Sequence, residues 1–132
     1  MVLVDGSGLP LAVDVDSASP AEVNLIEPLI DESVTPHVPE RLIYDRAADS
    51  DPLRQRLASR GIELICPHRR RRVKPPTQDG RPLRRFRRRW IIERTIAWLQ
   101  HFRRLVTRYE FYSFLFHSFA KLACMMIVLR RF

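Results

Sequence analysis

The alternation of apolar and polar residues in the first third of the chain predicts a β-hairpin followed by a helix. Apolar, β-prone runs at residues 1–4 and 9–15 flank a glycine-bearing turn, which is the pattern of a hairpin. A helix is predicted from Ser19, its N-cap, to about Ser33, with Pro20 in the first turn. The chain is therefore expected to begin with an antiparallel pair of strands and a helix.

Two carboxylates alternate with apolar residues at the end of the predicted hairpin, at Asp14 and Asp16. This spacing places both on one face of a strand, where a pair of carboxylates can bind a metal ion. A solvent-exposed strand face gives the same pattern, and we favour that interpretation.

The next segment predicts a strand, a helix and a second strand. The apolar run at residues 41–44 ends at Asp45, residues 49–60 are predicted to be helical, and residues 62–66 form another apolar run. Parallel strands joined in this way carry active sites in the crevice at their carboxyl ends. Asp45 is therefore a candidate active-site residue on topology alone, in a fold of the α/β class.

The last third of the chain follows the 3.6-residue period of helices. Residues 86–109 predict one long amphipathic helix, in which Glu93 shares a face with Phe86 and Arg89. The opposite face is expected to be buried and carries Ile91, Trp98, Phe102, Leu105 and Tyr109. Glu93 is thus one carboxylate within the densest positive charge of the chain.

Residues 111–129 are strongly apolar, and two kinds of helix fit them. Their length suits a membrane span. However, Lys121 and His117 fall in the middle of the run, and such groups are costly in hydrocarbon. We therefore expect a helix of the protein core and no membrane association.

Length and cysteine content suggest a single cytoplasmic domain. A chain of 132 residues is long enough to bury one core. Its two cysteines, Cys66 and Cys124, both lie in apolar contexts, so they are expected to be buried thiols in a reducing compartment.

Charge is distributed very unevenly along the chain. Residues 1–40 contain eight acids and no Lys or Arg, a net −8, whereas residues 41–132 hold all 23 basic residues and seven acids, a net +16. Of the basic residues 21 are Arg, which binds phosphate bidentately and stacks on bases. This bias favours contact with nucleic acid, although a genome of high GC content would also raise Arg over Lys.

Eleven of the 23 basic residues lie between Arg69 and Arg89. The stretch at residues 67–85 is rich in Arg and Pro and is predicted to be a mobile loop rather than a folded element. An exposed loop of this composition would bind a phosphate backbone with strong salt dependence. A localisation signal or an RNA-binding arm has the same composition.

Residues 86–100 resemble the signature helix of DDE-type insertion-sequence transposases. That motif reads Tyr-x-x-Arg-x-x-x-Glu-x6-Lys, and its Glu is the third catalytic acid. Arg89 and Glu93 match it, whereas Phe86 replaces the Tyr and Gln100 replaces the Lys.

Residues 42–51 are similar to the second-acid motif of the same family, Asp-Arg/Lys-Ala/Gly-Tyr-Asp-Ser. The match begins at Asp45, with Ala48 at the Tyr position and Tyr44 where the family has a small residue. The order of elements also agrees, so the resemblance covers nearly the whole chain.

The resemblance implies a ribonuclease-H-like α/β fold with long C-terminal helices, in which Asp45 is the second and Glu93 the third of three catalytic acids. Such acids hold two Mg²⁺ (or Mn²⁺) ions, the cofactors of DNA cleavage and strand joining. The implied partners are DNA, at the ends of an insertion sequence, and a second copy in the homodimer of the complete transposase. The implied DNA-binding residues are Arg46, Arg69, Arg70, Arg71, Arg72, Arg84, Arg85, Arg87, Arg88 and Arg89.

In that family the first acid lies on a strand before the hairpin, and Asp5 here matches a turn position instead. We therefore expect residues 1–132 to be the C-terminal part of a DDE transposase catalytic domain. This part would lack the first strand and have no activity alone. The edge left unpaired would favour self-association. A non-catalytic nucleic-acid-binding module or remnant, and a basic protein-interaction domain, are the alternatives.

Overall fold

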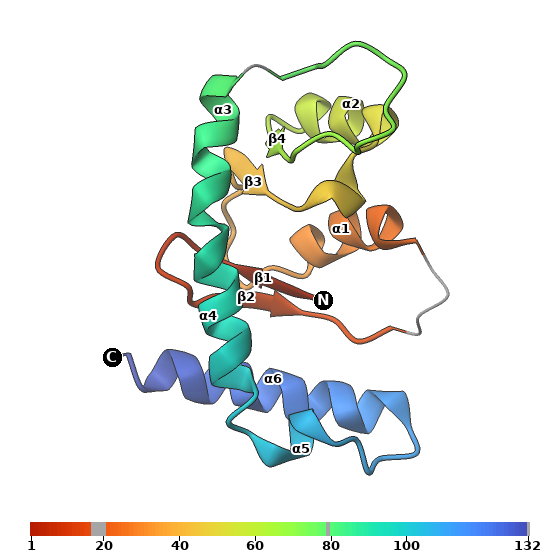
Figure 1. Ribbon diagram of the computed structural model, residues 1–132. Coiled ribbons are helices and arrows are strands. Elements are labelled where there is room, and N and C mark those ends of the chain that lie inside the picture. The colour runs from red at the N-terminus through yellow and green to blue at the C-terminus, as the bar shows by residue number, and fades with distance from the viewer. Residues whose placement is uncertain (17–20, 79, 132) are drawn as a thin grey trace.

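The computed structural model describes residues 1–16, 21–78 and 80–131 of the chain. These residues form a mixture of strands and helices, which confirms the α/β class. In chain order the elements are β1 (Val2–Val4), β2 (Pro10–Val13), α1 (Glu22–Asp31), β3 (Arg41–Ile43), the 3₁₀ helix η1 (Arg46–Ala48), α2 (Asp51–Ser59), β4 (Glu63–Ile65), α3 (Gly80–Arg84), the 3₁₀ helix η2 (Arg85–Arg89), α4 (Trp90–Leu99), α5 (Arg103–Val106) and α6 (Ser113–Leu129) (Figure 1).

The predicted hairpin is present, and its two faces belong to two different cores. β1 and β2 pair antiparallel, with Val2 opposite Val13 and Leu3 opposite Ala12. Because side chains alternate across a strand, Leu3 and Ala12 enter one core while Val2 and Val13 enter the other. The hairpin therefore lies between the two cores and contributes side chains to both.

The turn of the hairpin is held by Asp5, as expected for a turn residue. Its Oδ1 accepts hydrogen bonds from the N–H groups of Ser7 and Leu9, both at 2.8 Å. Gly8 adopts a φ of +87°, a conformation that glycine tolerates and other residues rarely adopt.

The first core lies between the hairpin, α1, α2 and the strands β3 and β4. The predicted β-α-β unit is confirmed, because β3 and β4 pair in parallel with Leu42 opposite Leu64. The Ser50 hydroxyl accepts a hydrogen bond from the Leu53 N–H at the start of α2, and Gly61 follows the helix at a φ of +77°. The buried residues of this core are Leu3, Ala12, Ile26, Leu29, Ile30, Leu42, Ala48, Leu53, Leu57, Ile62, Leu64 and Cys66.

Within the described residues, the two pairs of strands form separate sheets, β1–β2 and β3–β4, with no hydrogen-bonded ladder between them. The helix α1 begins at Glu22, after Ala21, which makes no side-chain cap. The predicted cap at Ser19 and Pro20 lies outside the described residues.

The prediction of a single long helix over residues 86–109 is wrong. α3, η2 and α4 run one after another as a rod that passes the strands and ends at α6, but the helix stops at Leu99 and a separate α5 follows (Figure 1). The reason is tertiary: Phe102 and Leu105 leave the axis of α4 to pack against the second core, beside α6. Tyr109, expected on the buried face, is 75% exposed.

The loop predicted over residues 67–85 is only partly confirmed. Residues 67–78 have no regular helix or strand, but Gly80–Arg84 form α3, which leads into η2. Because α3 and η2 are helical, this part of the segment is a folded element, contrary to the prediction.

The core helix predicted over residues 111–129 is present as α6, but only one of its faces is buried. Ala120, Ala123, Cys124 and Ile127 pack on the hairpin residue Val13 to form the second core. Large apolar residues on the other face are exposed. Within the part of the chain that the structure describes, no helix is both long and apolar enough to cross a membrane.

We predict that Gly8→Ala destabilises the fold by about 2 kcal/mol or more. A Cβ at this position would lie 3.1 Å from Thr95 Oγ1 and 3.2 Å from Ile91 Cγ2, in addition to the strain of the positive φ. Urea unfolding of the purified chain measures the change in the free energy of unfolding.

Two matched variants separate the causes. Gly61→Ala has the same kind of positive φ in open space and should cost about 1 kcal/mol. Gly6→Ala also has open space and no positive φ, and should stay within about 0.5 kcal/mol. Equal effects at Gly8 and Gly61 would mean that α4 does not press against the turn.

Candidate active site and its basic surroundings

Asp45 lies two residues after the last residue of β3, at the carboxyl end of the strand, as the topology predicted. Its Oδ1 accepts a hydrogen bond from the Ala47 N–H at 2.8 Å, which makes Asp45 the N-cap of η1. Its Oδ2 lies 3.6 Å from Nη2 of Arg89, at the end of η2. One oxygen of this carboxylate therefore holds the backbone, and the other faces the arginine.

Glu93 lies in the first turn of α4, one helical turn after Arg89. Its Oε1 lies 3.9 Å from the same Nη2 of Arg89. One guanidinium nitrogen thus lies within ion-pair distance of both carboxylates that the sequence predicted to act together. The side chains of Asp45, Arg89 and Glu93 are all at least a third exposed, so their attractions are weakened by solvent.

Tyr44 precedes Asp45 and occupies the place of a small residue in the motif. Its hydroxyl donates a hydrogen bond to Glu22 Oε2 at 3.3 Å. Burial and the Glu22 carboxylate raise the pKa of Tyr44 well above its usual value, so the phenol stays protonated. The larger side chain is therefore accommodated by a contact to α1.

A further carboxylate, Asp49, holds the basic segment of residues 69–72 in place. The sequence analysis did not predict this role. Its side chain is only 2% exposed. Asp49 Oδ1 lies 2.8 Å from Nδ1 of His68 and 3.2 Å from Nη2 of Arg54, and Oδ2 accepts the Arg69 N–H at 2.8 Å. Desolvation would raise the pKa of Asp49, but these hydrogen bonds outweigh it and lower the pKa to about 2.

Asp51, in the first turn of α2, holds the next part of the segment. Both of its carboxylate oxygens accept hydrogen bonds from Nη2 of Arg72, at 2.8 and 3.1 Å. These bonds to Arg72 lower the pKa of Asp51. The only signal for such anchoring in the sequence is the acidic pair that flanks Ser50, ahead of the arginine run.

This anchoring changes what the predicted DNA-binding arginines can do. Arg72 has a side chain that is 12% exposed and paired with Asp51, so it acts inside the protein. Arg69 donates to the carbonyl oxygens of Arg46 and Ala47, which brings the basic segment beside Asp45. The predicted residues whose side chains remain exposed are Arg46, Arg69, Arg70, Arg71, Arg84, Arg85, Arg87 and Arg88.

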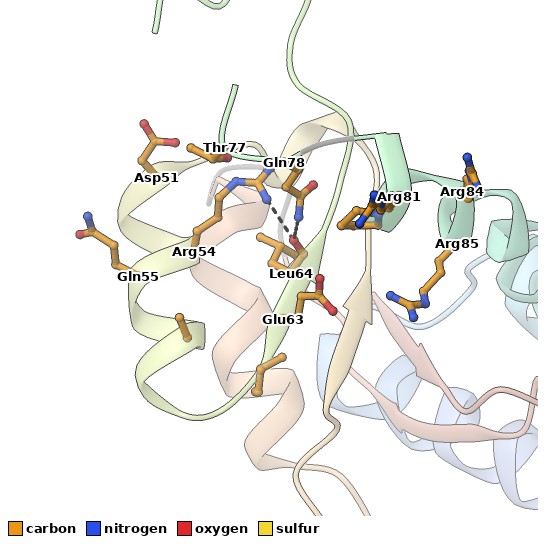
Figure 2. Close-up of a pocket in the computed structure, with 13 residues that line it drawn as sticks. Asp51, Arg54, Gln55, Glu63, Leu64, Thr77, Gln78, Arg81, Arg84 and Arg85 are labelled. Atoms are coloured by element: carbon orange, nitrogen blue, oxygen red, sulfur yellow. Dashed lines mark hydrogen bonds between the residues drawn. The ribbon is translucent and has the colours of Figure 1, made fainter. Parts of the chain in front are cut away.

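A cleft of about 1050 Å³ lies next to β4. Arg54 comes from α2 on one side, and Arg81, Arg84 and Arg85 come from α3 and η2 on the other (Figure 2). Figure 2 shows Arg54 and Gln78 converging on the carbonyl oxygen of Leu64, which both side chains donate to. The cleft is therefore basic, with Asp51 and Glu63 as its acidic lining residues.

The donor chemistry of Asp45 and Glu93 suits a divalent ion, but the pair is incomplete. Carboxylate oxygens are the hard ligands that Mg²⁺ and Mn²⁺ prefer. Among the described residues, no group of three or more His, Cys, Asp or Glu side chains is close enough to hold a metal. Asp14 and Asp16 belong to no such group either. A full site at Asp45 and Glu93 needs a further ligand.

Comparison with known proteins agrees with these motifs. The family model described as "Transposase DDE domain" matches residues 1–128. A Burkholderia cepacia protein that is assigned as the transposase of insertion sequence element IS402 is 37% identical over 134 residues, covering 96% of this chain. The chain spans 60% of the length of that curated relative. No solved structure matches the chain.

The Asp49 anchor predicts how stability depends on pH. Because the folded pKa of Asp49 is about 2 and its ordinary value is 3.8, its contribution is complete above pH 4 and is lost as the pH falls towards 2. Asp49→Asn should cost about 2 kcal/mol at neutral pH, and the variant should show a smaller loss of stability between pH 4 and 2.

Denaturant unfolding at a series of pH values measures this effect. The exposed Glu40, which pairs with Arg41 at 3.7 Å, provides the control Glu40→Gln, with an expected change below about 1 kcal/mol. An Asp49→Asn protein as stable as wild type at neutral pH would show that the basic segment is not anchored by this carboxylate.

Proposed function

Because this chain belongs to the transposase DDE domain family, we propose that it is the part of an insertion-sequence transposase that supplies Asp45 and Glu93 as two of three catalytic acids. The observation that carries this proposal is the position of Arg89. Its guanidinium lies between two carboxylates that come from distant parts of the sequence and reach a common, solvent-accessible point. Neither side chain belongs to either of the two hydrophobic cores.

In the complete enzyme, Asp45 and Glu93 would hold Mg²⁺ or Mn²⁺ with a third carboxylate. When bound, two such ions activate the attacking oxygen and stabilise the leaving oxygen of a phosphodiester. Asp45 Oδ1 accepts the Ala47 N–H, so Oδ2 would be the oxygen free to bind the metal ion. Arg89 would then turn from the acids to the DNA phosphate beside them.

The basic residues around the site support DNA as the substrate. The segment of Arg69–Arg72 reaches Asp45 from one side through the contacts of Arg69 to η1. The η2 arginines reach it from the other side, since η2 contacts β3. A phosphate backbone that passes the two acids would therefore meet arginines before and after the point of cleavage. The proposed contacts are Arg46, Arg69, Arg70, Arg71, Arg84, Arg85, Arg87, Arg88 and Arg89.

We propose a ribonuclease-H-like fold for the complete domain, with a further strand between β1 and β3. Two facts support this: both sheets contribute to the first core, and no ladder joins them among the described residues. A strand in that position, parallel to β3, would end beside Asp45 and could supply the third acid there. The complete transposase would be a homodimer that acts in the cytoplasm on the ends of its insertion sequence.

A non-catalytic DNA-binding role is the second candidate. It is favoured by the incomplete ligand set among the described residues and by the ion pairs of Arg89, whose guanidinium lies beside both acids. In that case the arginines would carry the whole activity, and Asp45 and Glu93 would only hold Arg89 in place.

We predict that the chain binds duplex DNA through the η2 arginines. In Arg85→Gln/Arg88→Gln, the slope of log affinity against log salt concentration should fall by about 2. Fluorescence anisotropy at several salt concentrations measures this. The control Arg56→Gln/Arg60→Gln removes the same charge from side chains paired with Glu27 and Asp31, and should leave the slope nearly unchanged. Equal loss in both variants would argue against a specific surface.

We also predict that the purified 132-residue chain does not nick supercoiled plasmid in the presence of Mg²⁺ or Mn²⁺, because two acids do not complete the metal pair. Gel electrophoresis measures nicking, and Asp45→Ala identifies a contaminating nuclease. Nicking by wild type that Asp45→Ala abolishes would show that the chain contains a complete site, and the proposal of a third acid from a further strand would be wrong.

A further inference from the structure

The face of α6 that points away from the second core is apolar and uncovered. Phe111 precedes the helix, and the other exposed side chains lie on the helix itself, each between 36% and 88% exposed. They are Phe111, Phe114, Leu115, Phe119, Leu122, Met125, Met126 and Leu129. Scattered apolar residues are normal on a protein surface, but a run of this length on one helix is not.

The spacing of these residues is that of a helix that pairs with another helix. Leu115, Phe119, Leu122, Met126 and Leu129 follow one another at intervals of four, three, four and three residues. This is the a/d repeat that forms the seam of a coiled coil. The buried side of α6 uses a different set, dominated by Ala120, Ala123 and Cys124.

The size of the face matches what a stable dimer buries. Taking roughly 200 Å² for each large side chain when fully exposed, the exposed fractions of these eight residues leave roughly 900 Å² of apolar surface. This is close to the roughly 800 Å² that each partner buries in a standard protein interface. A hollow between α5 and α6 continues this face, and Phe102, Leu105, Phe119, Leu122, Ala123 and Met126 line it together with Arg103 and Arg104.

The seam of α6 contains no charged residue, which favours an apolar partner over DNA or an acidic protein. Lys121 is the one charged residue within the sequence of α6. The basic residues next to the helix lie over aromatic rings of the same chain: Arg104 over Phe119, Arg108 over Phe116, Arg130 over Phe102 and Arg131 over Trp98. The seam residues themselves are therefore uncharged, and Arg103 and Arg104 of α5 lie at its edge, where they line the hollow between α5 and α6.

We propose that α6 is a homodimerisation surface, on which the α6 of a second copy packs along the seam from Leu115 to Leu129. A two-fold interface uses the same patch on both chains, and this patch presents the same repeat to itself. This inference rests on the homodimer of the proposed function and assigns its surface, but it does not depend on the metal or DNA chemistry, so either can fail without the other.

Sedimentation equilibrium of the 132-residue chain tests the proposal. At tens of micromolar, wild type is expected to have twice the 15.6 kDa mass of one chain. Leu122→Glu, at a half-exposed position in the centre of the seam, should raise the dimer dissociation constant at least about tenfold. Val34→Glu places the same charge at an exposed apolar residue away from α6 and should leave the dissociation constant unchanged.

Cross-linking gives a second readout that does not depend on a charge. Leu122→Cys should form a disulfide-linked dimer on mild oxidation, whereas the native thiols stay unreactive because both are buried and burial raises the pKa of Cys124 to about 11. A wild-type chain that is monomeric at these concentrations would overturn the proposal and leave the face to a different partner. A dimer unaffected by Leu122→Glu and not linked through Leu122→Cys would overturn it as well.

Discussion

The contact between α4 and the hairpin turn fixes where Glu93 of α4 lies. The Thr95 hydroxyl is fully buried and donates a hydrogen bond to the carbonyl oxygen of Gly8 at 2.6 Å. The next residue back, Arg94, donates to the carbonyl oxygen of Ser7 and lies between the rings of Trp90 and Trp98, 4.8 Å from each centroid. A side chain at residue 8 would push this helix away, so glycine there is a requirement of the packing.

From this contact the geometry of the site follows. Glu93 lies two residues before Thr95, on the side of α4 that faces solvent, and Arg89 lies one turn earlier. Because the hairpin and β3 belong to one core, the position of α4 on the hairpin also sets its position relative to Asp45. The ion pairs of Arg89 with both acids result from this placement. They are too exposed to create it, since solvent screening leaves such pairs worth about 1 kcal/mol or less.

Local patterns in the sequence were enough for the hairpin, the β-α-β unit and the position of Asp45, because each depends on residues that are close in sequence. The break after Leu99 could not be predicted in this way. The sequence there has neither Pro nor Gly, and the helix ends because Phe102 and Leu105 pack against α6. His101 supports the break by donating from Nδ1 to the Ala97 carbonyl oxygen. The contacts of Asp49 with residues 68 and 69 and the exposed apolar face of α6 also depend on tertiary structure, so local sequence patterns do not predict them.

The proposed divalent-ion site of Asp45 and Glu93 can be tested by paramagnetic broadening with Mn²⁺, which does not require activity. Amide resonances of the chain would be recorded during a Mn²⁺ titration, for wild type, Asp45→Asn and Glu93→Gln. If the two acids share one site, signals around Asp45 and around Glu93 broaden together, and either substitution suppresses the broadening at both. Broadening at only one of the two acids, or broadening that neither substitution changes, would contradict a shared site.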